Sequence, residues 1–148
     1  MKKLTHTDNE GKAVMVDIGS KEIQHRIAKA SGKISLKGET MKAISENQMK
    51  KGDVLTVAQI AGINAAKETG KLIPLCHNIV LDKVSVTFTL KKDSVLAESE
   101  ISCTGRTGVE MEALTAVSLA LLTVYDMCKA IDKEMVISDI RLTEKIKR

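Results

Sequence analysis

The stretch TGVEMEALTAVSLALLTVYDMCKA, residues 107–130, decides the fold of this chain. Leu114, Val117, Leu121 and Val124 recur in it at three- and four-residue spacings, which are typical of a buried helix face. Alanine and leucine fill most of the remaining circumference, so the predicted helix is apolar nearly all round. A helix of this kind is packed on more than one side.

The same helix carries four ionisable residues, Glu110, Glu112, Asp126 and Lys129. An isolated charge in an apolar interior is very costly, so these groups must be paired or must line a pocket. Asp126 and Lys129 are three residues apart, which is close enough for their side chains to touch. The sequence therefore predicts a buried acid–base pair, which is either a structural salt bridge or part of a catalytic site.

Glu110 and Glu112 follow TGRTG, residues 104–108, at the start of this helix. The partial positive charge of a helix N-terminus favours carboxylates there, so a purely structural role would also explain them. Glu112 and Asp126 fall on nearly the same face, but they lie about 21 Å apart along the axis at 1.5 Å per residue. Either one of the two carboxylates is structural, or two chains contribute to each site.

The remaining segments predict an α+β fold. Residues 54–69 form a clear helix that Asp53 caps at its start and Gly70 at its end. Period-two alternation predicts strands at 83–91 and 95–103, joined by a turn, and a last strand at 135–142.

Three further segments are less regular: residues 13–18 are an extended apolar run, 39–50 form a surface helix or an irregular segment, and 21–36 suit a strand or a helix. We favour the strand for 21–36 because it completes the order strand, helices, hairpin, long helix, strand. That order predicts a ferredoxin-like antiparallel sheet covered by helices on one face.

The composition predicts a single domain, residues 1–148, that can bury about two-thirds of its unfolded surface. Cys76, Cys103 and Cys128 are widely spaced and lack a CxxC pairing, so we expect neither a disulfide framework nor a metal site. Lysine and aspartate interrupt each apolar run, and no apolar segment follows the basic start. We therefore expect no membrane-spanning segment, no secretory signal and a cytoplasmic protein.

The formal net charge is +4, whereas aromatic residues make up only 1% of the chain. Proteins that bind single-stranded nucleic acids usually stack bases on aromatic rings, so we expect no nucleic-acid partner. A modest positive excess suits small phosphorylated ligands at least as well.

Two loops could carry chemistry. Lys51 precedes the helix at 54–69, where a lysine and free backbone N–H groups can meet an anion; it could equally be a solvated lysine. His77 ends the apolar stretch at 72–76, where a histidine is either a buried residue with a hydrogen-bond partner or a catalytic group.

Several motifs recur in order along almost the whole chain. They are LTH at 4–6, MVDI at 15–18, KGDV at 51–54, AQIAGINAAK at 58–67, LIPLCH at 72–77, TGRTGVEMEALTAVS at 104–118 and YDMCKA at 125–130. Together they closely resemble the molybdenum cofactor biosynthesis protein C (MoaC) family of cyclic pyranopterin monophosphate synthases. IPLCH, TGVEMEALTA and YDMCKA make this resemblance very specific.

The resemblance implies a ferredoxin-like subunit in a homohexamer, a trimer of dimers with sites between subunits. The implied reaction converts 3′,8-cyclo-7,8-dihydro-GTP, made by a partner radical SAM GTP cyclase, into cyclic pyranopterin monophosphate and pyrophosphate. The family's enzyme class is thus a pyrophosphate-releasing phosphorus–oxygen lyase. The resemblance implies that the protein holds no cofactor of its own. Mg2+ is expected to accompany the triphosphate of the substrate.

The resemblance also assigns site residues. Asp126 and Lys129 match the catalytic acid–base residues, and Lys51 matches a further catalytic lysine. The matching substrate-binding residues are Leu75, Cys76, His77, Glu110, Met111 and Glu112. Arg26 and Lys67 match positions at which members of the family contact the triphosphate of the substrate.

The chain departs from the family pattern at two places. Asn78-Ile79 replaces the usual Pro-Leu after IPLCH. TEKIKR replaces the usual tail KSGGKSG, so that Lys145 matches the first lysine of that tail and Lys147 matches the second only approximately. The alternatives to an enzyme are a noncatalytic nucleotide-binding subunit and a basic RNA-associated oligomer.

Overall fold

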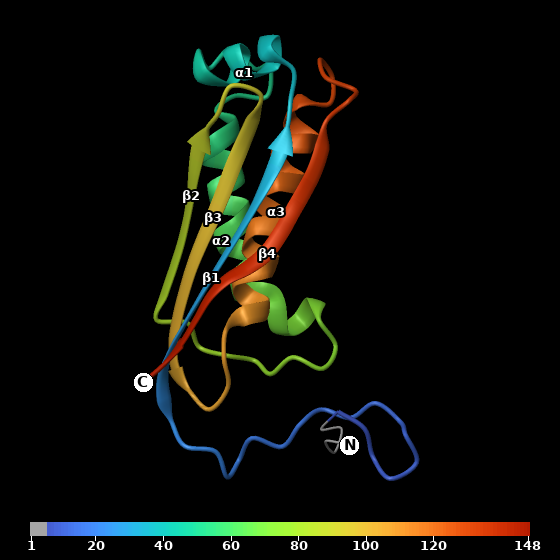
Figure 1. The fold of residues 1–148 in the computed structure, drawn as a ribbon, viewed down its shortest axis with the longest axis vertical. Helices are drawn as coiled ribbons and strands as arrows, with labels where there is room; N and C mark the ends of the chain where they lie inside the picture. Colours follow the sequence, from blue (N-terminus) through green and yellow to red (C-terminus); the bar gives the residue numbers. More distant parts are fainter. Residues whose placement is uncertain (1–5) are drawn as a thin grey trace.

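A computed structural model describes residues 6–148 as a four-stranded antiparallel sheet with two long helices on one face (Figure 1). The elements in chain order are β1 (Gln24–Ser35), α1 (Gly38–Ser45), α2 (Val54–Leu72), β2 (Lys83–Leu90), β3 (Ser94–Gly105), α3 (Glu110–Cys128) and β4 (Val136–Lys147). Leu4 and Thr5, which belong to the LTH motif, lie outside the described residues.

The strands lie in the order β2-β3-β1-β4, and each neighbouring pair is antiparallel. β1 therefore lies inside the sheet, between β3 and β4, which agrees with the strand predicted at 21–36. The predicted hairpin is also confirmed, because β2 and β3 pair from Leu90↔Val95 to Lys83↔Ser102. The expected ferredoxin-like α+β arrangement is confirmed by this topology.

α3 lies against the sheet on one side and against α2 on another, as its all-round apolar sequence predicts (Figure 1). The close approach of α2 to α3 depends on small residues. A Cβ on Gly62 of α2 would lie 2.9 Å from the carbonyl oxygen of Ala116 on α3. Contrary to the expectation from its charges, α3 is long and apolar enough to span a membrane by composition alone. Half of that stretch is buried, which identifies α3 as the core helix of the fold.

α2 begins as predicted but ends differently. The Asp53 carboxylate accepts a hydrogen bond from the Thr56 N–H at 3.1 Å, so the predicted N-cap is confirmed. The prediction that Gly70 ends the helix is wrong, because α2 continues to Leu72. Gly70 serves a close approach instead, since a Cβ there would lie 2.4 Å from Asn78 Oδ1 and 3.2 Å from the His77 carbonyl oxygen.

The last strand is longer than predicted, and the two irregularly patterned segments nearer the N-terminus are now defined. β4 runs to Lys147, five residues beyond the predicted strand, so the tail lysines lie on an edge strand of the sheet. Residues 13–18 form no strand, although Ala13 makes an isolated bridge with Thr7. The segment predicted at 39–50 is the short helix α1, which buries Met41 and Ile44.

Candidate functional site

The predicted site residues fall into two main groups at opposite ends of α3. Lys51, Asp126 and Lys129 lie at the end of the molecule near α1, whereas Glu110 and Glu112 lie at the other end (Figure 1). Asp126 lies fourteen positions after Glu112, which corresponds to about 21 Å of helix. The structure therefore leaves the two groups apart within one chain.

In the first group one carboxylate bridges two lysines. Asp126 Oδ2 lies 3.0 Å from Lys51 Nζ, and Asp126 Oδ1 lies 2.9 Å from Lys129 Nζ. Lys51 comes from the loop before α2, and Lys129 is the C-cap of α3, so the turn after one helix meets the start of the other. We call these three residues the Lys–Asp–Lys cluster.

The prediction that the Asp126–Lys129 pair is buried is wrong. The side chains of Lys51, Asp126 and Lys129 are 50%, 54% and 57% exposed, although Met127 and Cys128 in the same last turn of α3 are buried. Hydrogen bonds and charge from Lys129 and Lys51 lower the pKa of Asp126. Asp126 in turn raises the pKa of Lys129, so this lysine is not activated by desolvation in a single chain.

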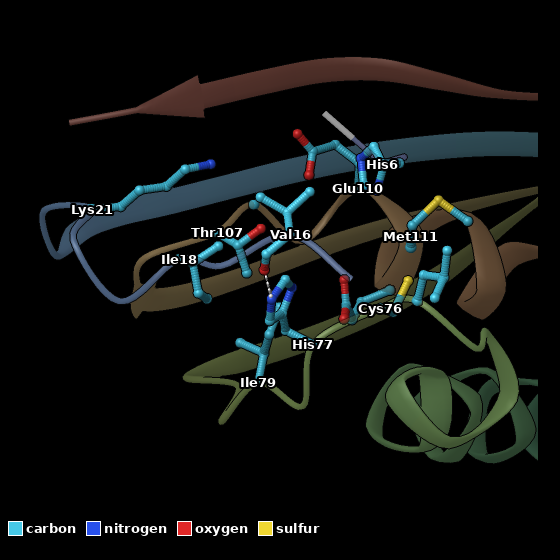
Figure 2. A pocket seen from close by; sticks show the side chains of 13 residues that line it. His6, Val16, Ile18, Lys21, Cys76, His77, Ile79, Thr107, Glu110 and Met111 are labelled. Carbon is cyan, nitrogen blue, oxygen red and sulfur yellow. Dashed lines mark hydrogen bonds between the residues drawn. The ribbon is translucent and has the colours of Figure 1, made fainter. Parts of the chain in front are cut away.

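The second group lines a pocket of about 340 Å³ at the N-terminal end of α3 (Figure 2). Three segments meet there: the irregular N-terminal segment, the loop after α2 and the first turn of α3. The pocket brings together the six predicted substrate-binding residues of the last two segments, Leu75, Cys76, His77, Glu110, Met111 and Glu112.

The two glutamates of this pocket have opposite surroundings. Glu112 is only 4% exposed, and burial raises its pKa, with the charge of Glu110 adding to the effect. Burial also acts on Glu110, but its ion pair with Lys145 prevails and lowers its pKa. The pocket therefore combines a carboxyl group that favours protonation with a carboxylate held in its ionised form.

His77 ties the N-terminal segment to the pocket. Its Nε2 lies 2.6 Å from the Val16 carbonyl oxygen, a hydrogen bond marked by the dashed line in Figure 2. A carbonyl can only accept, so Nε2 carries the proton. The thiol of Cys76 is partly buried, and burial together with the charge of Glu112 raises its pKa. Cys76 is therefore a poor nucleophile in this setting.

A neighbouring basic pocket of about 460 Å³ holds Arg26. Its other lining residues are Lys21, Glu22, Gln24, Lys145 and Lys147. Arg26 Nε donates to the Gly105 carbonyl oxygen at 3.1 Å, which fixes the guanidinium beside the end of β3. Lys145 pairs with Glu110 and so connects this basic pocket to the pocket at α3.

Lys67 joins neither group and does not line the basic pocket of Arg26. It lies on α2 and lines a separate hollow with Asp82 and Lys83. Ile79 borders both this hollow and the pocket at α3. Within one chain the structure therefore gives Lys67 no contact with the other predicted residues that would bind a triphosphate.

Sequence reasoning missed the contribution of the N-terminal segment to the pocket. His6, Val16, Ile18 and Lys21 all line it. The motifs LTH and MVDI were the available signal, since they match the family pattern although they show no helix or strand periodicity. Among residues 6–148 no group of three His, Cys, Asp or Glu side chains is placed to hold a metal ion.

The fold and these side chains define a small α+β protein of ferredoxin-like topology, with a basic pocket near one end of α3 and a cluster of acid–base side chains at the other. The sequence model of the MoaC family matches residues 15–147. The chain belongs to the MoaC family.

Similar proteins agree with this assignment. The cyclic pyranopterin monophosphate synthase of Novosphingobium aromaticivorans is 58% identical over 98% of this chain and 92% of its own length. The synthase of Desulfitobacterium hafniense is 54% identical over 97% of this chain and 88% of its own length. Molybdenum cofactor biosynthesis protein 1 of Drosophila melanogaster is 54% identical over 97% of this chain, which matches 26% of that longer protein.

Proposed function

We propose that this chain is a cyclic pyranopterin monophosphate synthase, a lyase of molybdenum cofactor biosynthesis. Its substrate is 3′,8-cyclo-7,8-dihydro-GTP, supplied by a radical SAM GTP cyclase, and its products are cyclic pyranopterin monophosphate and pyrophosphate. The observation that carries the proposal is the Lys–Asp–Lys cluster, in which Asp126 lies within 3.0 Å of both Lys51 and Lys129. The resemblance to the family assigns the acid–base roles to these three residues.

The chemistry of the reaction suits the cluster. Rearranging the purine and ribose requires repeated proton transfers, for which positioned lysine and aspartate side chains can act as general acids and bases. A protonated lysine can also stabilise charge on the triphosphate when a hydroxyl attacks phosphorus and pyrophosphate leaves. In a single chain, Asp126 raises the pKa of Lys129 and so keeps it a proton donor.

The pocket at the start of α3 would hold the guanine-derived part of the substrate. Leu75, Cys76 and Met111 supply apolar contacts, and Glu110 and Glu112 supply hydrogen-bonding oxygens for ring N–H groups. The triphosphate would lie towards the basic pocket, where Arg26 and the tail lysines offer positive charge. No cofactor held by the protein is needed, and Mg2+ would enter with the triphosphate oxygens that bind it.

A complete site then requires two chains. The pocket and the Lys–Asp–Lys cluster are separated by about 21 Å of α3, which is too far for one small substrate to contact both ends. We infer that the pocket of one subunit faces the cluster and Lys67 of another, in a cytoplasmic hexamer built as a trimer of dimers. Apolar side chains exposed on α2 and β4, Val57, Ile60, Ile140 and Leu142, offer surface for such contacts.

The test is a coupled assay with GTP, the radical SAM cyclase and this protein. We expect a product that oxidises to a fluorescent pterin, together with pyrophosphate released in equal amount. Binding of the cyclised nucleotide without turnover would contradict the proposal and favour a noncatalytic binding subunit. Light scattering on the same preparation tests the assembly, and a monomer at working concentration would contradict the two-chain site.

A further inference from the structure

The Lys–Asp–Lys cluster cannot hold its own geometry. All three side chains are at least half exposed. Exposed ion pairs gain little energy against water and lose side-chain entropy, so they do not fix the backbones that carry them. The distance between Lys51 and Asp126 is therefore set by whatever joins the loop before α2 to the end of α3.

A buried carboxylate lies just beyond the cluster. Asp132 is only 1% exposed and accepts three hydrogen bonds, from the Lys37 N–H at 2.9 Å, Thr40 Oγ1 at 3.0 Å and the Glu134 N–H at 3.1 Å. Burial opposes its ionisation, but these hydrogen bonds prevail and lower the pKa of Asp132. Asp132 is thus an ionised group whose position is fully specified by its donors.

Two of these donors belong to the start of α1. Lys37 is the N-cap of this helix, and its own side chain makes no capping hydrogen bond. Asp132, 95 residues away, accepts instead from the N–H of Lys37 itself and from the hydroxyl of Thr40, and places its negative charge at the positive end of the helix. A helix of eight residues is marginal by itself, so the position of α1 depends on such contacts.

The other side of this contact is the turn that follows α3. The N–H groups of Ile131 and Asp132 both donate to the Cys128 carbonyl oxygen, at 3.0 and 3.1 Å, and so join the turn to the helix end. Lys129 lies in this turn, whereas α1 leads into the loop that carries Lys51. One buried carboxylate therefore connects the two chain segments that meet in the cluster.

We propose that Asp132 is a positioning residue for the reaction, which holds Lys51 in register with Asp126 and Lys129 by capping α1 from the turn after α3. Asp132 is buried and cannot touch the substrate, so it acts only through the cluster. The inference rests on the proposed function, because it assigns the cluster to proton transfer.

Steady-state turnover of the cyclised nucleotide by Asp132→Ala, Asp132→Asn and Thr40→Val tests this role. Displacing a catalytic group by about 1 Å can cost up to about 100-fold in rate, so we expect Asp132→Ala to lose at least about tenfold in kcat. KM should change little, because the pocket that holds the base lies at the far end of α3. Asn retains one oxygen that can accept from Lys37 and Thr40, so Asp132→Asn and Thr40→Val should lose less.

Val86→Ala is the control for a general loss of stability. Val86 is buried between the sheet and α2, away from the cluster, and its truncation should lower Tm without changing kcat per folded molecule. Three results would overturn the role of Asp132: kcat losses that only follow the folded fraction, an increase in KM at constant kcat, or a normal kcat in Asp132→Ala.

If Asp132→Ala does not fold, the other two variants decide. A normal kcat in both Asp132→Asn and Thr40→Val would then overturn the proposal, whereas a graded loss would support it. A wild-type protein without turnover would instead contradict the proposed function itself, so the two failures are distinguishable.

Discussion

The two ends of α3 carry the same kind of residue in opposite environments. Glu112, in the first turn, is almost completely buried, and burial raises its pKa. Asp126, in the last turn, is about half exposed, and Lys129 and Lys51 lower its pKa. One helix thus presents a carboxyl group that favours the proton at one end and a carboxylate that favours the charge at the other.

This difference assigns the two ends to different tasks. A buried carboxyl group in a largely apolar pocket recognises a ligand by hydrogen bonds, and burial disfavours its charged form. An exposed aspartate between two lysines can exchange protons and meet phosphate groups, but it offers no enclosure. A reaction on a nucleotide needs both functions, and the distance between them is why we propose that two subunits share each site.

The largest expected effect follows from disabling the exposed end. Lys129→Ala, Lys51→Ala and Asp126→Asn should each lower product formation by at least about 100-fold, the range associated with general acid–base groups. Tm should change little, because exposed pairs contribute little to stability. The coupled assay and a melting curve on each variant measure both quantities.

Lys92→Ala, in the turn between β2 and β3, removes an exposed positive charge outside the cluster and is the matched control. Near-normal turnover combined with a much lower Tm in the cluster variants would show that the cluster is structural.

Mixing variants tests whether the two ends act across subunits. We expect Lys129→Ala protein, co-refolded with protein carrying Glu110→Gln and Glu112→Gln, to regain activity that neither has alone. Some mixed sites would then combine an intact pocket from one chain with an intact cluster from another. Co-refolding Lys129→Ala with Asp126→Asn is the control, because no mixed site regains a whole cluster. Absence of recovery in verified mixed oligomers would rule out a shared site.

A smaller effect is expected from the tail. Replacing Lys145 and Lys147 together by Ala should weaken binding of substrate or of a triphosphate analogue more than it lowers kcat, since both lysines line the basic pocket. The salt dependence of binding should also decrease. The double variant Lys91→Ala and Lys92→Ala carries the same change in net charge at a distant turn. If the two double variants and wild type bind the ligand equally well, Lys145 and Lys147 do not contribute to binding.

The smallest expected effect concerns stability at the buried end. Because the folded-state pKa of Glu112 is raised, the stability it contributes is fully present below its unfolded pKa, near 4.5, and is lost as pH rises through the folded value. Glutamine does not ionise, so Glu112→Gln does not lose this stability as the pH rises. The Tm of the variant minus the Tm of wild type should therefore increase from about pH 4 to about pH 7. A Tm difference that is constant over this range would contradict the assigned cause.

Much of this comparison could be predicted from the sequence. The spacing of Leu114, Val117 and Leu121 predicted the central helix. The motifs around Lys51, Asp126 and His77 gave, by resemblance, candidate residues that the structure gathers in the cluster and the pocket. Helical geometry alone also gave the separation between Glu112 and Asp126. Local patterns suffice for these features because each depends on residues close in the sequence.

Exposure could not be predicted in the same way. The pattern of α3 shows which residues are apolar, but only the tertiary structure shows that the Asp126 side chain is about half exposed while Met127 and Cys128 beside it are buried. Gly70 looked like a helix end, although it is a glycine because the Asn78 loop packs against it. The irregular segment that carries Val16 has no periodicity, so its place over the pocket depends on a long-range hydrogen bond to His77.

The pairing of β4 with β1 has a consequence for how a ligand would be held. Lys145 pairs opposite Ala28, Lys147 pairs opposite Arg26, and the last residue, Arg148, exchanges backbone hydrogen bonds with His25. The backbone of these basic residues is therefore ordered when the protein folds, before any anion arrives. A glycine-rich tail would lose that conformational freedom only on binding. This chain thus presents its tail charges in advance, and the entropy lost on binding is limited to their side chains.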